Sequence, residues 1–254
     1  MSTSTTPGAG GLLLPRYAPV PEGVHAPLLS PDYRSTVRRS PARPPVDLLQ
    51  RLTEITGPLL GEDRVTERDA DLTAQAEVEP MGQRIVVQGQ VRDSDGRAVP
   101  HTLVEVWQAN AGGRYRHLGD QWPAPLDPGF VGVGRTLTDA DGRYRFTTVK
   151  PGAYPWGNHH NAWRPAHIHF SLFGRAFTQR LVTQMYFPDD PLFGQDPIYG
   201  VVPEAARERL VSRFSLVDTV PSWALAYEFD IVLRGRDATP FEAHDTSGDE
   251  DDEA

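Results

Sequence analysis

The stretch from residue 154 to residue 169 reads Tyr-Pro-Trp-Gly-Asn-His-His-Asn-Ala-Trp-Arg-Pro-Ala-His-Ile-His, and Phe-Ser-Leu follows it. Side chains alternate faces along an extended strand, so His167 and His169 point to one side while Ile168 and Phe170 point to the other. The pattern predicts a strand over residues 166–172 whose apolar face lies against a core. The two imidazoles on its other face can chelate one metal ion, and two ordinary surface histidines are the simpler alternative.

Alternating apolar and polar residues predict further strands on both sides of this stretch. They are expected at Arg84–Val91, Thr102–Trp107, Arg135–Thr138, Arg143–Thr147, Leu181–Phe187 and Ala226–Leu233. Asp-Ala-Asp-Gly at residues 139–142 reads as a hairpin turn, because Asp-Gly tolerates positive φ angles. One longer helix is expected at Glu204–Phe214, with Pro203 near its first turn. Many strands and few helices predict an all-β fold, an antiparallel β-sandwich with one or two short helices.

Composition divides the chain into four parts. Residues 1–47 are rich in Pro and Gly and predict an extended N-terminal arm, whose arginine-rich segment is either solvated or docked on an acidic neighbour. Residues 48–82 predict a connector with a short helix near Asp47–Ile55. Residues 83–242 form the predicted β-sandwich, and residues 243–254 a disordered acidic tail.

Charge and cysteine content restrict the possible functions. The chain has no cysteine, which excludes disulfides, thiolate metal sites, iron–sulfur clusters and thiol nucleophiles. The net charge of −9 comes largely from the tail, and nothing in the balance suggests nucleic-acid binding. The N-terminus has no basic segment, and the apolar run Leu12–Leu14 is too short for a signal peptide or membrane span. A cytoplasmic protein is therefore expected.

Two tyrosines extend the candidate metal site. Tyr154 opens the stretch quoted above, and Tyr115 lies far upstream in Gly-Gly-Arg-Tyr-Arg-His. If both converge with His167 and His169 on one ion, the phenolate and imidazole donors favour ferric iron over zinc, copper(I) or calcium. Free phenols have a pKa near ~10, so only a strong Lewis acid ionises two of them at neutral pH. Two phenolates and a hydroxide neutralise a ferric ion, and an ortho-diphenol could replace one phenolate and the hydroxide as a chelate.

A ferrous site with two histidines and one carboxylate is the competing arrangement. It would need an acidic residue near the histidine pair, and residues 154–169 contain none.

Several blocks of sequence, in this order, resemble the intradiol ring-cleaving dioxygenases. They are Val106–Asn110, Gly113–His117, Tyr154–Trp156, Trp163–His169, Thr183–Phe187 and Phe229–Gly235. The resemblance runs from about Tyr33 through Glu242 and is strongest with the protocatechuate branch of the family. The β subunits of that branch carry iron and assemble with α subunits of related fold.

The resemblance implies a role for individual residues. One Fe(3+) per chain would be held by Tyr115, Tyr154, His167 and His169. Tyr154 would leave the metal when substrate binds, and it would share the catalytic machinery with Arg164 and Gln184. Trp156 and Ile198 would line the substrate pocket.

The same resemblance implies a reaction and a partner. The reaction is the O2-dependent cleavage of protocatechuate between its two hydroxylated carbons, giving 3-carboxy-cis,cis-muconate. The partner is a homologous α subunit in a hetero-oligomer, and no nucleic acid or membrane is expected to bind.

Two other functions remain open. The chain could be a non-catalytic β-sandwich subunit like the α subunits, although these lack the iron ligands and all four are present here. It could also act on hydroxyquinol or a chlorocatechol. Enzymes for those substrates usually have a longer helical N-terminal region, which the Pro-rich arm does not match.

Residues without a match to the family motifs receive simpler interpretations. Tyr144, Tyr186, Tyr199 and Tyr227 are expected to pack in the core or on the surface rather than bind metal. His159 and His160 are expected to be solvent-exposed loop residues, and Trp107 and Trp163 core residues.

Overall fold

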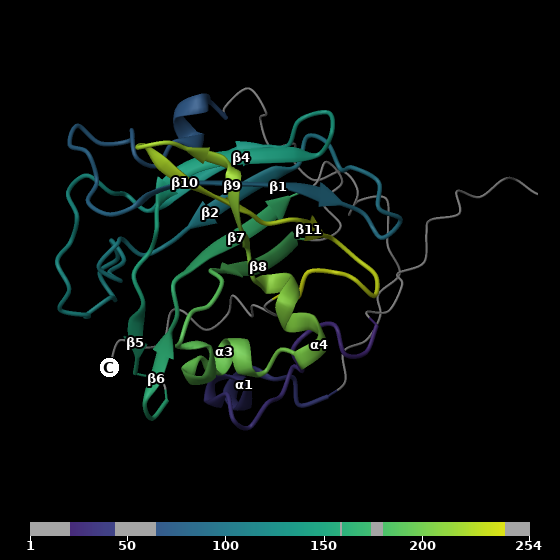
Figure 1. Ribbon diagram of the computed structural model, residues 1–254. Helices are drawn as coiled ribbons and strands as arrows, with labels where there is room; N and C mark the ends of the chain where they lie inside the picture. Colours follow the sequence, from purple (N-terminus) through teal and green to yellow (C-terminus); the bar gives the residue numbers. More distant parts are fainter. Residues whose placement is uncertain (1–20, 44–64, 158, 174–179, 242–254) are drawn as a thin grey trace, which may run out of the picture.

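A computed structural model describes residues 21–43, 65–157, 159–173 and 180–241, and strands dominate it. One sheet has the order β11-β1-β10-β9, with β4 also paired to β1. Its strands are β1 (Arg84–Arg92), β4 (Arg143–Val149), β9 (Arg213–Val220), β10 (Ala224–Glu228) and β11 (Ile231–Val232). The second sheet has the order β3-β2-β7-β8. Its strands are β2 (Leu103–Trp107), β3 (Val133–Leu137), β7 (His167–Phe173) and β8 (Arg180–Tyr186). Figure 1 shows the two sheets stacked face to face.

The core lies between the two sheets and confirms the predicted β-sandwich. Ile168 and Phe170 of β7 are fully buried in it, as the alternation predicted, together with Ile85 and Val87 of β1. The strand β7 is antiparallel to both of its neighbours, β2 and β8. The larger sheet is mixed, because β1 is parallel to β10 and β11.

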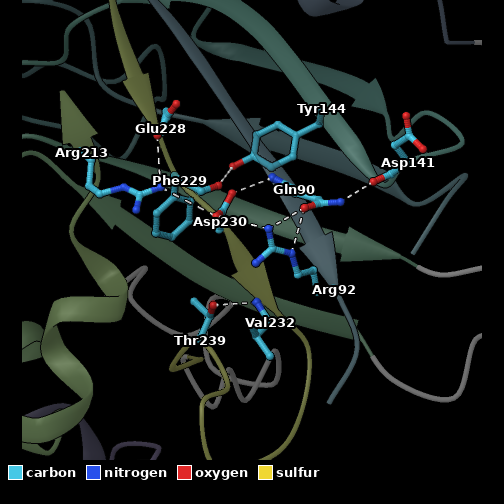
Figure 2. A network of polar contacts seen from close by, with 10 residues as sticks. All are labelled: Gln90, Arg92, Asp141, Tyr144, Arg213, Glu228, Phe229, Asp230, Val232 and Thr239. Carbon is cyan, nitrogen blue, oxygen red and sulfur yellow. Dashed lines mark hydrogen bonds and ion pairs between the residues drawn. The ribbon is translucent and has the colours of Figure 1, made fainter. Parts of the chain in front are cut away.

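The strand predicted at Ala226–Leu233 is in fact two strands, β10 and β11, with a break at Phe229 and Asp230. Figure 2 shows the polar contacts at this break. The Asp230 carboxylate accepts a hydrogen bond from the Gln90 backbone N–H at 3.0 Å, and the Tyr144 hydroxyl donates to the Phe229 carbonyl at 2.5 Å. Side chains thus add hydrogen bonds where β1 changes partners, and alternation alone does not predict such a break.

Glycine at position 89 makes this break possible. A Cβ atom there would lie 1.9 Å from the Phe229 carbonyl oxygen, far closer than two such atoms can approach. The Phe229 N–H donates to the Gln88 carbonyl at 2.8 Å, which holds the two chain segments at this short separation.

The helix predicted at Glu204–Phe214 is wrong beyond Leu210. The helical part consists of α4 (Glu204–Arg207) and the 3-10 turn η4 (Glu208–Leu210), and β9 follows at Arg213. Phe214 pairs with Tyr227 across β9 and β10, with ring centroids 5.7 Å apart. Cross-strand pairing therefore overrides the helical spacing of apolar residues in this segment.

The described part of the N-terminal arm is not extended throughout. It contains α1 (Arg34–Arg39), which follows the buried Tyr33. The connector contains the 3-10 helix η2 (Glu67–Ala70). The helix predicted at Asp47–Ile55 and the acidic tail 243–254 lie outside the described residues. Among the helices described, none has the length and apolarity needed to cross a membrane.

Four short elements complete the end of the molecule that carries the candidate site. The strands β5 (Tyr154–Trp156) and β6 (Ala162–Arg164) form a separate hairpin. The 3-10 turn η3 (Phe193–Gln195) and the helix α3 (Pro197–Gly200) lie next to it (Figure 1).

Candidate metal centre

Three parts of the chain bring the four predicted ligands into one cluster. His167 and His169 project from the same face of β7, with ring centroids 4.9 Å apart. The Tyr154 hydroxyl, from the hairpin, lies 3.4 Å from Nε2 of His167. The Tyr115 ring meets the Tyr154 ring edge to face at 5.6 Å and lies 6.4 Å from the His169 ring. Residues separated by more than fifty positions therefore meet at one point.

A tight loop after β2 positions Tyr115. Gly113 has a φ of 79°, and a Cβ there would lie 2.3 Å from the Ala153 carbonyl oxygen. The Asn110 side chain accepts hydrogen bonds from the Gly112 and Arg114 N–H groups at 2.9 and 3.0 Å. This bracing keeps the loop against the start of the hairpin that carries Tyr154.

The surroundings of His167 favour a neutral imidazole. Its Nδ1 lies 2.6 Å from the Pro165 carbonyl oxygen, which can only accept, so Nδ1 carries the proton and Nε2 presents its lone pair to the cluster. Burial lowers the pKa of His167 well below its usual value, and the nearby Arg164 and His169 lower it further. Neutral imidazole is the form that binds metal ions.

The donor set fits a hard, highly charged ion. The phenol oxygen of Tyr115 and Nδ1 of His169 are buried, so both atoms are shielded from water. Within the described ranges, no group of three or more His, Asp or Glu side chains could hold a metal. The described residues therefore offer no site with two histidines and one carboxylate, and the phenol oxygens supply the anionic donors that ferric iron favours.

Arg164 and Gln184 lie together beside the cluster. Arg164 is opposite Tyr154 in the hairpin, and Gln184 is opposite His169 across β7 and β8. The Arg164 guanidinium donates through Nη2 to the Gln184 side-chain oxygen and through Nε to Asp196, at 3.2 Å for the latter. Arg164 is only 4% exposed, so its charge is buried next to the histidines.

Sequence reasoning missed Asp196, which completes this polar group. It accepts hydrogen bonds from Arg164 and, at 2.9 Å, from the hydroxyl of Tyr186. Tyr186 is buried, as predicted. Its ring packs in the core, and its hydroxyl takes part in the hydrogen bonds around Asp196. The Asp-Pro pair at 196–197 is a helix-start signal that could have drawn attention to this position.

The two predicted pocket residues lie in different surroundings. Ile198, in α3, lines a cavity of about 390 Å³ together with Gln184 and Tyr186, between the body and the N-terminal arm. Trp156, in β5, lies under the Arg164 guanidinium at 5.9 Å and meets the Tyr33 ring at 5.5 Å. Both are half-buried.

Three ring residues differ from their predicted surroundings. His159 is half-buried rather than exposed, because Nε2 accepts from the Arg34 N–H at 3.1 Å and the ring stacks on Trp156. His160 is exposed, as predicted. Trp107 and Trp163 are half-buried rather than core residues, and Trp107 stacks directly on His169 at 4.8 Å.

Two protein families match this chain over different ranges. Residues 55–235 match the family described as Dioxygenase, and residues 17–51 match the one described as Protocatechuate 3,4-dioxygenase beta subunit N terminal. A protocatechuate 3,4-dioxygenase beta chain from Burkholderia cepacia is 62% identical over 220 residues, covering 86% of this chain and 94% of that one. The chain belongs to the intradiol dioxygenase family.

Two further relatives are similar to this dioxygenase at lower sequence identity. A protocatechuate 3,4-dioxygenase alpha chain from Pseudomonas putida is 34% identical, over 63% of this chain and 76% of that one. A hydroxyquinol 1,2-dioxygenase from Rhizobium sp. (strain MTP-10005) is also 34% identical, over 60% of this chain and 55% of that one. The β-chain relative is thus matched over nearly its whole length, and the hydroxyquinol enzyme over about half.

Proposed function

We propose that this dioxygenase uses O2 to cleave protocatechuate between its two hydroxylated carbons, giving 3-carboxy-cis,cis-muconate. The observation that carries the proposal is the convergence of Tyr115, Tyr154, His167 and His169 in a chain 62% identical to a protocatechuate 3,4-dioxygenase beta chain. A non-catalytic subunit would have no use for a cluster of two phenols and two imidazoles.

The cofactor in this proposal is one ferric ion, held by the two tyrosines and the two histidines. When bound, such an ion withdraws electron density from a chelated diol and makes its ring reactive toward O2. The neutral state of His167 and the hard phenol oxygens support this assignment.

Tyr154 and Tyr115 have different roles in the proposal. Tyr154 lies on a three-residue strand of a two-stranded hairpin and is half-buried, so its ring has room to leave the cluster. Its phenolate oxygen can then accept a proton from a substrate hydroxyl. Tyr115, held by the braced loop, stays in place.

Arg164 acts on the bound substrate, and Gln184 orients Arg164. The buried guanidinium of Arg164 places a fixed positive charge beside the cluster, where it stabilises negative charge that develops on substrate oxygen atoms. Gln184 receives a hydrogen bond from Arg164 and so fixes its direction. Trp156 and Ile198 supply apolar surface on the approach to the cluster.

The proposal includes an α-chain partner and a cytoplasmic location. Similarity to a relative named as a beta chain, and weaker similarity to one named as an alpha chain, supports a hetero-oligomer of two homologous chains.

Oxygen uptake tests the proposal. The chain should be purified with and without a co-expressed α chain and supplied with protocatechuate, catechol and hydroxyquinol. We expect uptake with protocatechuate and a product with the ultraviolet spectrum of 3-carboxy-cis,cis-muconate. Uptake with hydroxyquinol but not with protocatechuate would contradict the substrate assignment.

A further inference from the structure

A buried carboxylate joins two parts of the candidate site. The two oxygens of Asp196 bind different groups, since Oδ2 accepts from Nε of Arg164 at 3.2 Å and Oδ1 accepts from the Ile198 N–H at 2.8 Å. The Asp196 side chain is fully buried and that of Arg164 nearly so. The hairpin and the helix α3 are therefore connected through a single residue.

Arg164 and Asp196 form an ion pair that is buried away from water. A buried ion that loses its partner is strongly unfavourable, and the Asp196 carboxylate facing Arg164 offsets the cost of burying the guanidinium charge. The Tyr186 hydroxyl donates to the same Asp196 oxygen at 2.9 Å and approaches Nη2 of Arg164 at 3.5 Å. This third contact fixes the angle at which the carboxylate meets the guanidinium.

We propose that Asp196 is a positioning residue, which sets the direction of the Arg164 guanidinium and holds Ile198 at a fixed place relative to it. The inference rests on the proposed function and deepens it. Asp196 holds Nε of Arg164, while Nη2 of Arg164 donates to Gln184 beside the cluster.

The substitution Asp196→Asn tests the proposal, because an amide keeps the size of the side chain and its ability to accept from Ile198 while removing the charge. We expect kcat for protocatechuate to fall by about 10- to 100-fold, the usual effect of losing a residue that orients a group at a metal site. KM should change far less than kcat, since the lost interaction acts on developing charge rather than on substrate binding. Iron content should equal that of the wild type.

Two variants separate positioning from a general loss of stability. Asp127 is another buried aspartate, whose carboxylate accepts from the Met81 and Gly129 N–H groups and contacts no predicted site residue. Asp127→Asn should leave kcat unchanged even if it lowers the melting temperature. Tyr186→Phe removes one hydrogen bond to Asp196 without changing any charge, and it should lower kcat by a smaller factor than Asp196→Asn.

A double-mutant cycle with Arg164→Gln shows whether Asp196 acts through Arg164. If it does, adding Asp196→Asn to the Arg164→Gln variant should change kcat by less than about twofold, because the group being oriented is already gone. An equal fall of kcat in both backgrounds would overturn the proposal.

A measurement without metal or substrate completes the test. In apoprotein labelled with 15N-arginine, the Nε–H signal of Arg164, assigned by its loss in Arg164→Gln, should exchange slowly with water. In Asp196→Asn this exchange should become faster by about tenfold or more. Unchanged exchange, or wild-type kcat, in Asp196→Asn would overturn the positioning role of Asp196 but not the proposed function. The proposed function would be overturned if the wild-type protein consumed no oxygen.

Discussion

Trp107 lies flat on His169, with ring centroids 4.8 Å apart and ring planes only 3° from parallel. The two residues are direct neighbours across β2 and β7, so the contact is built into the register of the sheet. A stacked ring of this size leaves the imidazole little freedom to rotate. Trp107 therefore fixes the direction in which His169 presents its nitrogen to the cluster.

We expect Trp107→Leu to weaken iron binding by about tenfold, because His169 loses the surface that orients it. Iron content after dialysis against a graded chelator series measures the change. Trp223→Leu is the matched control, since Trp223 is 45% exposed and contacts Arg84 rather than the cluster. Equal iron retention in both variants would show that the stacking has no role at the metal.

Tyr154→Phe should still bind iron, because three of the four predicted ligands remain. Its visible charge-transfer band should shift, and kcat should fall by about 100-fold or more, since the phenolate that accepts a substrate proton is missing. Absorption spectra and oxygen uptake of the same preparation measure both effects. Tyr199→Phe, which keeps its ring packing on Phe193, should match the wild type in both. Wild-type kinetics in Tyr154→Phe would remove its assigned role.

The four clustered side chains could be proposed from residue types and strand alternation, whereas the roles of Arg164, Gln184, Trp156 and Ile198 came only from the resemblance to the family. The alternation at Ile168 and Phe170 gave the orientation of the histidine pair, because one face of a strand in a sandwich must be apolar. Trp107 and Asp196 could not be found in the same way. The contact of Trp107 depends on the register between β2 and β7, and the contacts of Asp196 depend on how α3 packs beside the hairpin. The spacing of residues within one segment predicts neither.

The errors in the fold have a similar origin. The segment after Leu210 has apolar residues at helical spacing, but Phe214 pairs with Tyr227 on the neighbouring strand. The break between β10 and β11 depends on the contacts of Asp230 with Gln90 and of Tyr144 with the Phe229 carbonyl, and these partners lie far apart in the chain (Figure 2). Tertiary pairing decided both cases against the local pattern.

Gly89→Ala should be strongly destabilising. The new methyl group would lie 1.9 Å from the Phe229 carbonyl oxygen, so β1 must separate from the segment between β10 and β11. We expect the free energy of unfolding to fall by about 3 kcal/mol, as for other overpacked sites in a core. Urea unfolding followed by tryptophan fluorescence measures this. Gly157→Ala is the control, because a Cβ atom at that position would have no atom within 4 Å. A loss as small as that of the control would mean that the close approach is not needed for stability.

His25 should make the stability of the apoprotein depend on pH. Its Nδ1 accepts a hydrogen bond from the Phe241 N–H at 3.2 Å, and its ring lies 4.0 Å from that of Phe241. Burial, and to a lesser degree the charge of Arg209, lowers the pKa of His25 from 6.5 to about 4. The contact joins the N-terminal arm to the last described residues of the chain.

The direction of the effect follows from proton binding. Between pH 6.5 and about 4 the unfolded chain takes up a proton at His25 that the folded chain does not. The stabilising contribution is therefore fully present above pH 6.5 and is lost as the pH falls toward 4. Urea unfolding of the apoprotein at about pH 7 and about pH 5 should show a smaller pH dependence for His25→Leu than for the wild type. His160→Leu, at an exposed position, should keep the wild-type dependence. Equal pH dependence in His25→Leu and the wild type would mean that protonation of His25 does not oppose folding.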